Sequence, residues 1–328
     1  KKKFMEENTE QRLDLTLFSE KIQELKERIA SVVVGQEQTV DLVLTAILAN
    51  GHVLIEGVPG VAKTLLARLT ARLIDADFSR IQFTPDLMPS DVLGTTVFNM
   101  KTNGFDFHQG PIFADIVLVD EINRAPAKTQ AALFEVMEER QVSIDGTTHR
   151  MGELYTILAT QNPVEQEGTY KLPEAQLDRF LMKITMDYPS LKEEVNILER
   201  HHTNAALVKL EDVTPVLTKE ELLSLRALMS RVFVDRTLLQ YIALIVQQTR
   251  TSKAVYLGAS PRASVAMLQS SKAYALLQGR DFVTPEDIKF VAPYVLQHRL
   301  ILTAEAEMEG YSPVKVTQRL IDKVEVPK

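Results

Sequence analysis

The sequence predicts an α/β domain built on a mostly parallel sheet, followed by an all-α domain. Short apolar runs typical of buried strands alternate with helical patterns up to about residue 188. Beyond Tyr188-Pro189-Ser190 only helical patterns remain. Because strands that alternate with helices favour a parallel sheet covered by helices on both faces, we expect the α/β domain to span residues 1–188 and the helical domain residues 189–328.

Length, composition and charge are those of a globular protein with a full core. The 328 residues are 45% hydrophobic and 25% charged, and this length favours two domains. A net charge of −7 argues against a protein that mainly grips nucleic acid, although it does not exclude a local basic pore. The absence of Cys excludes disulfides and thiolate metal sites and fits a cytoplasmic protein. No apolar run is long enough to span a bilayer.

Apolar spacing and turn residues predict the elements in order. The predicted helices of the first domain cover residues 18–29, 40–48, 63–74 and 129–139. The predicted strands cover residues 52–56, 80–83, 116–120, 155–160 and 181–186. Two hairpins are expected, one around Asn103-Gly104, which suits a type I′ turn, and one around Asp145-Gly146. In the second domain, Ser260-Pro261 and Thr284-Pro285 each offer an N-cap and a proline at the first helical position.

A glycine-rich turn between the first predicted strand and the helix at 63–74 has the pattern of a phosphate-binding loop. It comprises Gly57, Val58, Pro59, Gly60, Val61, Ala62, Lys63 and Thr64. Its glycines permit a tight turn that points backbone N–H groups at phosphates, and the helix directs its positive end there. We expect Lys63 to reach the β- and γ-phosphates of ATP and the Thr64 hydroxyl to bind Mg²⁺. Ala62 replaces the usual glycine, which is tolerable if this residue has helical angles. The alternative is a glycine-rich turn with an incidental Lys-Thr pair.

The strand predicted at residues 116–120 ends in two carboxylates, Asp120 and Glu121. A strand that is apolar throughout is buried on both faces, so its polar end falls at the carboxyl edge of the sheet, where ligands bind in open α/β sheets. We expect Asp120 to hold Mg²⁺ through water, and Glu121 to orient and deprotonate the attacking water. The alternative is a strand followed by a solvated acidic turn.

Three more polar residues suit ATP hydrolysis. Asn162 follows the strand at 155–160, and its amide could hold a water in line with the γ-phosphate, although Asn before a proline is also a common turn residue. Arg179 precedes the last predicted strand, and Arg262 opens a helix of the second domain. Arginine suits contact with developing phosphate charge, but spacing alone favours surface ion pairs for both.

In the blocks around these residues the chain resembles the MoxR family of AAA+ ATPases, from about Val34 to Arg262. Besides the glycine-rich loop, the blocks cover residues 120–126, 159–163, 167–180 and 258–262. Several such blocks in the same order are more specific than any one of them. The stretch with Ala62 is itself similar to the loop of this family. The resemblance implies an AAA+ core followed by a helical lid.

The resemblance also implies roles for individual residues. Asn162 matches the sensor 1 position. Arg179 matches the arginine finger, which would act on ATP held by the neighbouring subunit, and Arg262 matches the sensor 2 arginine, which would contact ATP from the lid of its own subunit. Val34 and Gly35 lie in a segment similar to the family's adenine-side segment, and an ordinary turn between helices is an equal alternative. The two hairpins resemble the helix-2 and pre-sensor-1 inserts of one AAA+ branch, which would face the ring pore or a partner.

For the whole protein, the resemblance implies a Mg²⁺-dependent ATP hydrolase that works as a homo-oligomeric ring, with a hexamer favoured. It would act as a chaperone-like remodeller of client proteins, in protein maturation or metal insertion, with a von Willebrand factor A-domain partner. Two alternatives stay open. A nucleic-acid motor of the same branch has weak support, because the hairpins carry few basic residues. A nucleotide-dependent scaffold with little turnover is disfavoured by the presence of both Glu121 and Arg179.

Overall fold

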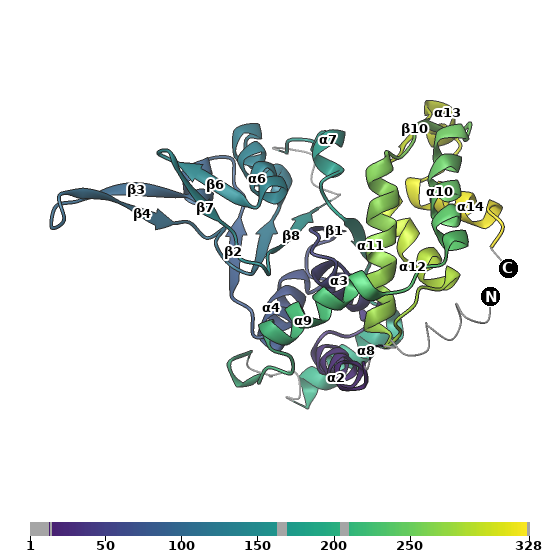
Figure 1. Cartoon of the computed structure of the whole chain (residues 1–328), viewed down its shortest axis with the longest axis horizontal. Coiled ribbons are helices and arrows are strands. Elements are labelled where there is room, and N and C mark those ends of the chain that lie inside the picture. Colours follow the sequence, from purple (N-terminus) through teal and green to yellow (C-terminus); the bar gives the residue numbers. More distant parts are fainter. Residues whose placement is uncertain (1–12, 14, 163–168, 204–209, 327–328) are drawn as a thin grey trace, which may run out of the picture.

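The computed structural model describes residues 13, 15–162, 169–203 and 210–326, and a five-stranded sheet lies at its centre (Figure 1). Its strands are β1 (Val53–Gly57), β2 (Phe78–Gln82), β5 (Ile116–Asp120), β8 (Thr156–Gln161) and β9 (Met182–Met186). The strand order is β2-β5-β8-β1-β9, and every neighbouring pair is parallel. The predicted parallel sheet is therefore confirmed, and the carboxyl ends of all five strands lie along one edge.

Alternate side chains of the strands pack on opposite faces of the sheet. The helices of this domain are α2 (Thr16–Val32), α3 (Glu37–Leu48), α4 (Lys63–Leu73), α5 (Pro89–Leu93) and α6 (Ala127–Glu139), with single turns at η2 (Ile122–Arg124) and α7 (Glu174–Leu177). Val53 and Ile55 of β1 join the large core formed with α2, α3, α4 and the second domain. Leu54, between them, joins a second core formed with α5 and α6. Because side chains of a strand alternate with a period of two, both faces are buried, as predicted.

The chain after β9 is mainly helical: residues 191–228 lie beside the helices of the first domain, and residues 236–323 lie to one side of the sheet (Figure 1). Its helices are α8 (Leu191–His202), α9 (Lys219–Leu228), α10 (Arg236–Thr251), α11 (Pro261–Leu277), α12 (Pro285–Leu296), α13 (Ala304–Met308) and α14 (Pro313–Lys323), with turns η3 (Leu210–Asp212) and η4 (Met229–Arg231). Thr284 caps α12 through its side chain as predicted, whereas the Ser260 side chain does not cap α11. None of the helices in the described part of the chain has the length and apolar character to cross a membrane.

One prediction for the second domain is wrong in detail. The domain contains a small antiparallel pair, β10 (Val255–Leu257) and β11 (Ile301–Leu302), where no strand was expected. Alternation of apolar and polar residues identifies a strand only when it continues over about four residues or more, so strands of two and three residues show no recognisable pattern.

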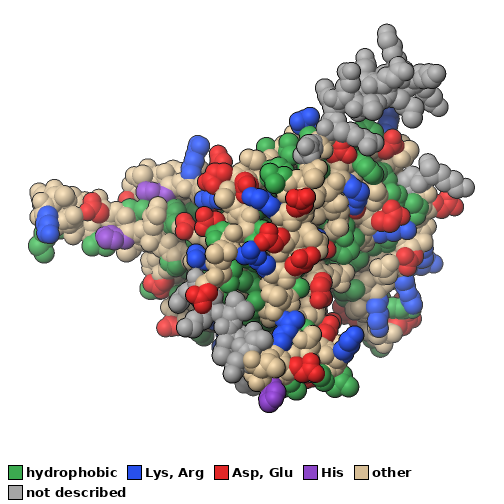
Figure 2. Space-filling view, turned by 90° about the horizontal axis from the view of Figure 1, so that it is seen from below, with side chains coloured by type: hydrophobic (Ala, Val, Ile, Leu, Met, Phe, Trp, Pro, Cys, Tyr) green, Lys and Arg blue, Asp and Glu red, His purple; other side chains and the backbone are tan. Residues whose placement is uncertain are grey.

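Two hairpins extend from the α/β domain. β3 (Gly94–Asn99) and β4 (Gly104–Gln109) form a long arm that projects away from the body (Figures 1 and 2). β6 (Gln141–Ile144) and β7 (Thr147–Arg150) form a second hairpin (Figure 1). In the second hairpin Asp145 and Gly146 have φ values of 49° and 80°, as a type I′ turn requires. The first hairpin differs from the prediction: Asn99 pairs with Gly104, so a four-residue loop connects the strands and Gly104 is already the first residue of β4.

Candidate functional site

The glycine-rich loop joins the end of β1 to the start of α4. Gly57 is required by close packing, because a Cβ there would lie 2.7 Å from the carbonyl oxygen of Met186 on β9. Gly60 is required by its backbone, which has a φ of 90°. Ala62 has φ 63° and ψ 24°, so it does not have the right-handed helical angles under which an alanine would be tolerable without strain. The loop imposes a left-handed conformation that favours glycine, and the alanine adopts it at a cost of roughly 1–2 kcal/mol.

Lys63 and Thr64 form the first turn of α4, directly behind the loop. The Lys63 ammonium Nζ donates to the carbonyl oxygen of Gly57 at 2.5 Å, so the side chain lies across the loop. The rest of the loop is anchored by Val61, which is buried, while Val58 is half-buried and Pro59 is exposed. A lysine beside a glycine-rich loop and the N-terminus of a helix together form an environment suited to a phosphate group.

Asp120 ends β5, and two neighbouring strands hold its buried carboxylate. Arg80 Nε on β2 donates to Oδ2 at 2.6 Å, and the Thr160 hydroxyl on β8 donates to Oδ1 at 3.2 Å. A hydroxyl and a carboxylate are hard oxygen donors of the kind that Mg²⁺ prefers, so Thr64 and Asp120 fit that ion chemically. Within the described residues no group of three or more His, Cys, Asp or Glu side chains could hold a metal. A Mg²⁺ ion here would therefore depend on phosphate oxygens and water for its other ligands.

Glu121 follows with a strained backbone, since its φ is 55° and its ψ is 52°. A left-handed conformation at a residue other than glycine costs roughly 1–3 kcal/mol and is often found at functional sites. The Glu121 backbone N–H donates to the Thr160 hydroxyl at 3.0 Å. Its carboxylate Oε2 accepts a hydrogen bond from Gln82 Nε2 at 2.8 Å and lies 3.3 Å from Arg124 Nε. These contacts fix the carboxylate at the carboxyl edge of the sheet.

Asn162 lies one residue beyond β8 and is buried. The register pairs Glu56 of β1 with Gln161 of β8, which places Asn162 level with Gly57 at the start of the loop. The structure therefore brings the loop, Asn162 and the two carboxylates together at the ends of three adjacent strands. Pro163, Glu167 and Gly168, which contribute to the family resemblance, lie outside the described residues.

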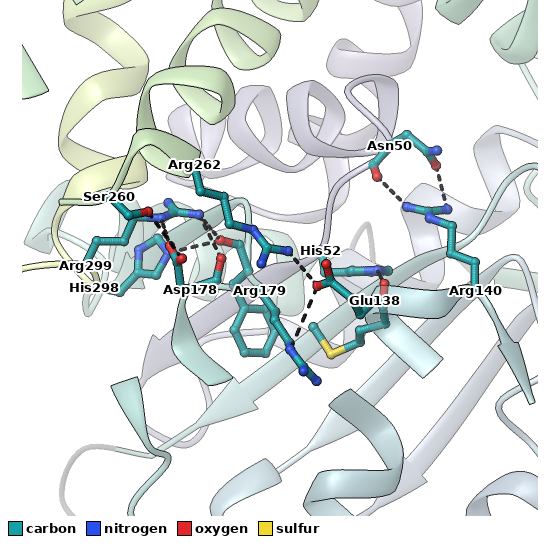
Figure 3. Close-up of polar contacts among 12 residues, drawn as sticks. Asn50, His52, Glu138, Arg140, Asp178, Arg179, Ser260, Arg262, His298 and Arg299 are labelled. Atoms are coloured by element: carbon teal, nitrogen blue, oxygen red, sulfur yellow. Dashed lines mark hydrogen bonds and ion pairs between the residues drawn. The ribbon is translucent and has the colours of Figure 1, made fainter. Parts of the chain in front are cut away.

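Arg179 and Arg262 lie at the opposite edge of the sheet. Arg179 directly precedes the segment in which the Leu181 N–H donates to the carbonyl oxygen of His52, before the start of β1. Arg262 Nη2 bonds Glu138 Oε2 at 2.6 Å, and Arg179 Nε lies 3.8 Å from the same oxygen (Figure 3). Five-residue strands separate the two edges by roughly 15 Å. The structure thus brings the two arginines together, away from the phosphate loop of their own chain, and Arg262 does not have the position expected for contact with its own ATP.

Two ring side chains at this opposite edge, His52 and Tyr155, are buried beside the half-buried Arg140. Arg140 Nη1 donates to the Asn50 side chain at 2.9 Å and to the carbonyl oxygen of Tyr155 at 3.3 Å. Burial, and secondarily the charge of Arg140, lower the pKa of His52 to about 3. Burial also raises the pKa of the Tyr155 hydroxyl. At this part of the edge, the neutral His52 and Tyr155 rings therefore lie next to the Arg140 guanidinium.

Val34 and Gly35 form the connection between α2 and α3. Gly35 has a φ of 72°, and a Cβ added there would lie 2.5 Å from Cδ of Glu193 at the start of α8. The connection therefore packs closely against the second domain. This position is compatible both with an adenine-side segment and with an ordinary turn.

Five further residues contact the predicted site residues and were not predicted for the site: Arg80, Gln82, Arg124, Glu138 and Thr160. Arg80 and Gln82 lie two apart in a predicted strand, so a shared face next to the acidic strand was a signal that could have identified them. Glu138 carried no such signal, because its partner Arg262 lies 124 residues further along the chain.

Comparison with known proteins extends over both domains. A family described as "ATPase family associated with various cellular activities (AAA)" matches residues 52–182, and the AAA lid domain matches residues 247–322. The chain is 48% identical over 301 residues to YeaC, an uncharacterised protein of Bacillus subtilis, covering 92% of this chain and 93% of that protein. It is 44% identical over 309 residues to Chaperone MoxR1 of Mycobacterium tuberculosis (92% and 81%) and 31% identical over 316 residues to Protein MoxR of Methylorubrum extorquens (90% and 91%). The crystal structure of a candidate ATPase from Cytophaga hutchinsonii matches with a TM-score of 0.87 at 41% identity, covering 95% of this chain and 96% of that one.

Proposed function

Because this chain belongs to the MoxR family of AAA+ ATPases, we propose that it hydrolyses ATP with Mg²⁺ in a ring whose sites are each completed by the neighbouring subunit. The observation that carries this proposal is the division of the candidate residues between two sheet edges. The phosphate loop and Glu121 lie at one edge, and Arg179 lies with Arg262 at the other. A head-to-tail contact allows the second edge of one subunit to meet the first edge of the next.

Within one subunit, the residues at the carboxyl edge bind ATP and prepare the water. Lys63 exchanges the Gly57 carbonyl for the phosphates, together with the loop amides. Thr64 and Asp120 would hold Mg²⁺, which would supply positive charge against the phosphates. Glu121 accepts the proton of the attacking water as general base, and Asn162 holds that water in line with the γ-phosphate.

The neighbouring subunit supplies the positive charge. Arg179 contacts the γ-phosphate of the adjacent ATP, and we assign Arg262 to the same shared site. A contact between Arg262 and ATP of its own subunit would require it to leave Glu138 and reach the opposite edge of the sheet. Glu138 keeps the two guanidiniums next to each other until a nucleotide phosphate competes for them.

The proposed substrate is a protein client, remodelled during protein maturation or metal insertion with a von Willebrand factor A-domain partner, in the cytoplasm. One relative is named a chaperone. The β3–β4 arm exposes large apolar side chains, with Met100 at 87% and Phe105 at 73%. On the face shown in Figure 2, acidic and basic side chains are intermixed over the body. These features favour a polypeptide over nucleic acid, and binding to DNA that weakened steeply with added salt would favour the motor instead.

The test is the ATPase rate as a function of protein concentration for wild type, Glu121→Gln and Arg179→Ala. Specific activity should rise with concentration in wild type, and each variant alone should be inactive while still binding nucleotide. In an equal mixture, about one quarter of the sites combine an intact Glu121 with an intact Arg179 from the neighbour, so turnover should return to about that fraction. A rate per subunit that is independent of dilution and unaffected by Arg179→Ala would refute the shared site. Absence of turnover at any concentration would favour the scaffold.

A further inference from the structure

The segment that carries Arg179 is held by the end of a lid helix. Immediately after α12 the chain turns back against the α/β domain and hydrogen-bonds to the backbone between residues 178 and 183. Figure 3 shows two of the residues involved, His298 and Arg299, beside Asp178. The three consecutive residues that make these bonds are Gln297, His298 and Arg299. The lid therefore contacts residues 178–183, called the finger segment below, through three consecutive side chains.

Arg299 makes the largest number of these bonds. Its Nε donates to Asp178 Oδ1 at 2.6 Å, and its Nη2 donates to the carbonyl oxygens of Asp178 at 3.2 Å and Phe180 at 2.7 Å. Its Nη1 donates to the carbonyl oxygen of Leu181 at 3.1 Å. These carbonyls lie on both sides of Arg179, so one guanidinium fixes the backbone of the finger residue from both directions.

The contact between Arg299 and Asp178 is an ion pair in which the guanidinium is buried and the Asp178 side chain is 28% exposed. The Arg299 side chain is 3% exposed, and burial lowers its pKa, an effect that the hydrogen-bonded Asp178 carboxylate opposes. A buried charge is tolerated only when it is paired and hydrogen-bonded, so the guanidinium and the 178–181 backbone depend on each other.

The start of α11 contacts the same carboxylate. The Ser260 hydroxyl lies 3.5 Å from Asp178 Oδ2, although Ser260 is in the N-cap position where its side chain would ordinarily bond the helix backbone. Arg262, two residues later, shares Glu138 with Arg179. The start of α11 and the residues after α12 therefore both contact Asp178, and the start of α11 also contacts Glu138, the partner of Arg179.

We propose that Arg299 is the positioning residue for the arginine finger: it ties Asp178 and the 178–181 turn to the lid, so that Arg179 keeps the orientation in which it meets the nucleotide of the next subunit. This inference rests on the proposed function, since it requires that Arg179 acts in the neighbour's site. Lid movement then displaces Arg179 and Arg262 together.

The test compares Arg299→Lys with a matched substitution elsewhere in the lid. Lysine keeps the positive charge, but its ammonium lacks the planar set of N–H donors with which Arg299 binds one carboxylate and three carbonyl oxygens. The control is Arg280→Lys, since Arg280 forms a bidentate pair with the buried Asp287 at 2.7 and 2.5 Å, within the lid. Asp178→Asn, which removes the partner charge at constant size, provides a second variant if Arg299→Lys does not fold.

We expect Arg299→Lys and Asp178→Asn to lower kcat at least about tenfold, equivalent to about 1.4 kcal/mol, with nucleotide affinity within about twofold of wild type. Arg280→Lys should keep wild-type turnover per folded subunit. Hydrogen exchange should accelerate at the amides of residues 174–183 in Arg299→Lys, with β1 and β5 unchanged. Turnover of Arg299→Lys equal to that of Arg280→Lys, or unchanged exchange in residues 174–183, would overturn the proposal.

Mixed rings locate the defect. Arg299→Lys should regain turnover when mixed with Glu121→Gln, which donates an intact finger, and should not regain it with Arg179→Ala, which lacks one. If Arg179→Ala recovers with Glu121→Gln but Arg299→Lys does not, Arg299 does not act through the finger and the proposal fails. If Arg179→Ala itself fails to recover, the shared site of the proposed function fails, and the exchange experiment still shows separately whether Arg299 holds the segment.

Discussion

His52, the residue before β1, makes two hydrogen bonds that require a neutral ring. Its Nε2 lies 3.1 Å from the carbonyl oxygen of Met137 and donates to it, and its Nδ1 accepts the backbone N–H of Ile157 at 3.0 Å. A protonated Nδ1 could not accept that bond. This geometry agrees with the lowering of the His52 pKa to about 3, which burial and the nearby Arg140 charge cause.

The lowered pKa makes the stability of the fold sensitive to acid. Below pH about 6.5 His52 is protonated in the unfolded chain, whereas in the folded chain it stays neutral down to pH about 3. The contribution is therefore complete above pH 6.5 and is lost as the pH falls toward 3. Each pH unit in this window removes about 1.4 kcal/mol, so a change from pH 7.5 to 5 removes about 2 kcal/mol. The buried His298, whose pKa is also lowered, acts in the same direction.

The perturbation is His52→Gln, measured by denaturant unfolding at pH 7.5 and pH 5. At pH 7.5 the variant should lose about 1–3 kcal/mol, because the Ile157 N–H loses its acceptor. Between the two pH values, however, its stability should fall by about 2 kcal/mol less than that of wild type. His201→Gln on α8 is the matched control, since His201 is exposed and should leave the pH dependence unchanged. An identical fall in stability for His52→Gln and wild type would refute the requirement for a neutral ring.

Three further substitutions test the phosphate loop and its surroundings. Ala62→Gly should remove the strain of the positive φ and raise the free energy of unfolding by up to about 1 kcal/mol. The control Ala67→Gly, in the interior of α4, should lower the free energy of unfolding by at least about 1 kcal/mol. Destabilisation by both substitutions would contradict the strain at Ala62. Lys63→Ala should weaken binding of a fluorescent ATP analogue at least about tenfold, since it removes a charged phosphate contact, and unchanged affinity would exclude that contact. Arg80→Gln removes the cation that competes for Asp120, so half-maximal turnover should need about two- to fivefold less Mg²⁺, and a higher requirement would mean that Arg80 orients the carboxylate instead.

The carboxyl edge of the sheet could be predicted because local sequence specifies it. The strand at residues 116–120 has the predicted bounds, because the apolar run and the Asp that ends it are both visible in the sequence. The loop from Gly57 to Thr64 was identified from its position between a strand and a helix. The conformation of Ala62 could not be predicted, because closure of the loop imposes a positive φ against the preference of alanine.

The opposite edge could not be predicted, because tertiary packing alone assembles it. Glu138 meets Arg262 only when the start of α11 reaches the end of α6, and Arg299 reaches Asp178 only when the lid folds back on the chain before β9. No spacing rule relates residues more than 100 positions apart. The prediction of a two-residue turn at Asn103-Gly104 was wrong for a related reason. The pairing of Asn99 with Gly104 follows from the register of the whole arm, and not from the Asn-Gly dipeptide.

The separation of Glu121 and Arg179 on opposite edges has a consequence for how activity is counted under the proposed function. An open row of subunits always has one terminal nucleotide edge without a donor and one terminal donor edge without a nucleotide, so it contains one complete site fewer than it has members. Only a closed ring uses every subunit, and a contact between two unlike surfaces closes only at the right angle. A molecule that covers the Arg179 edge of one subunit would therefore stop ATP hydrolysis in the adjacent subunit, while the covered subunit could still hydrolyse its own ATP. The inhibited site and the occupied surface would belong to different chains.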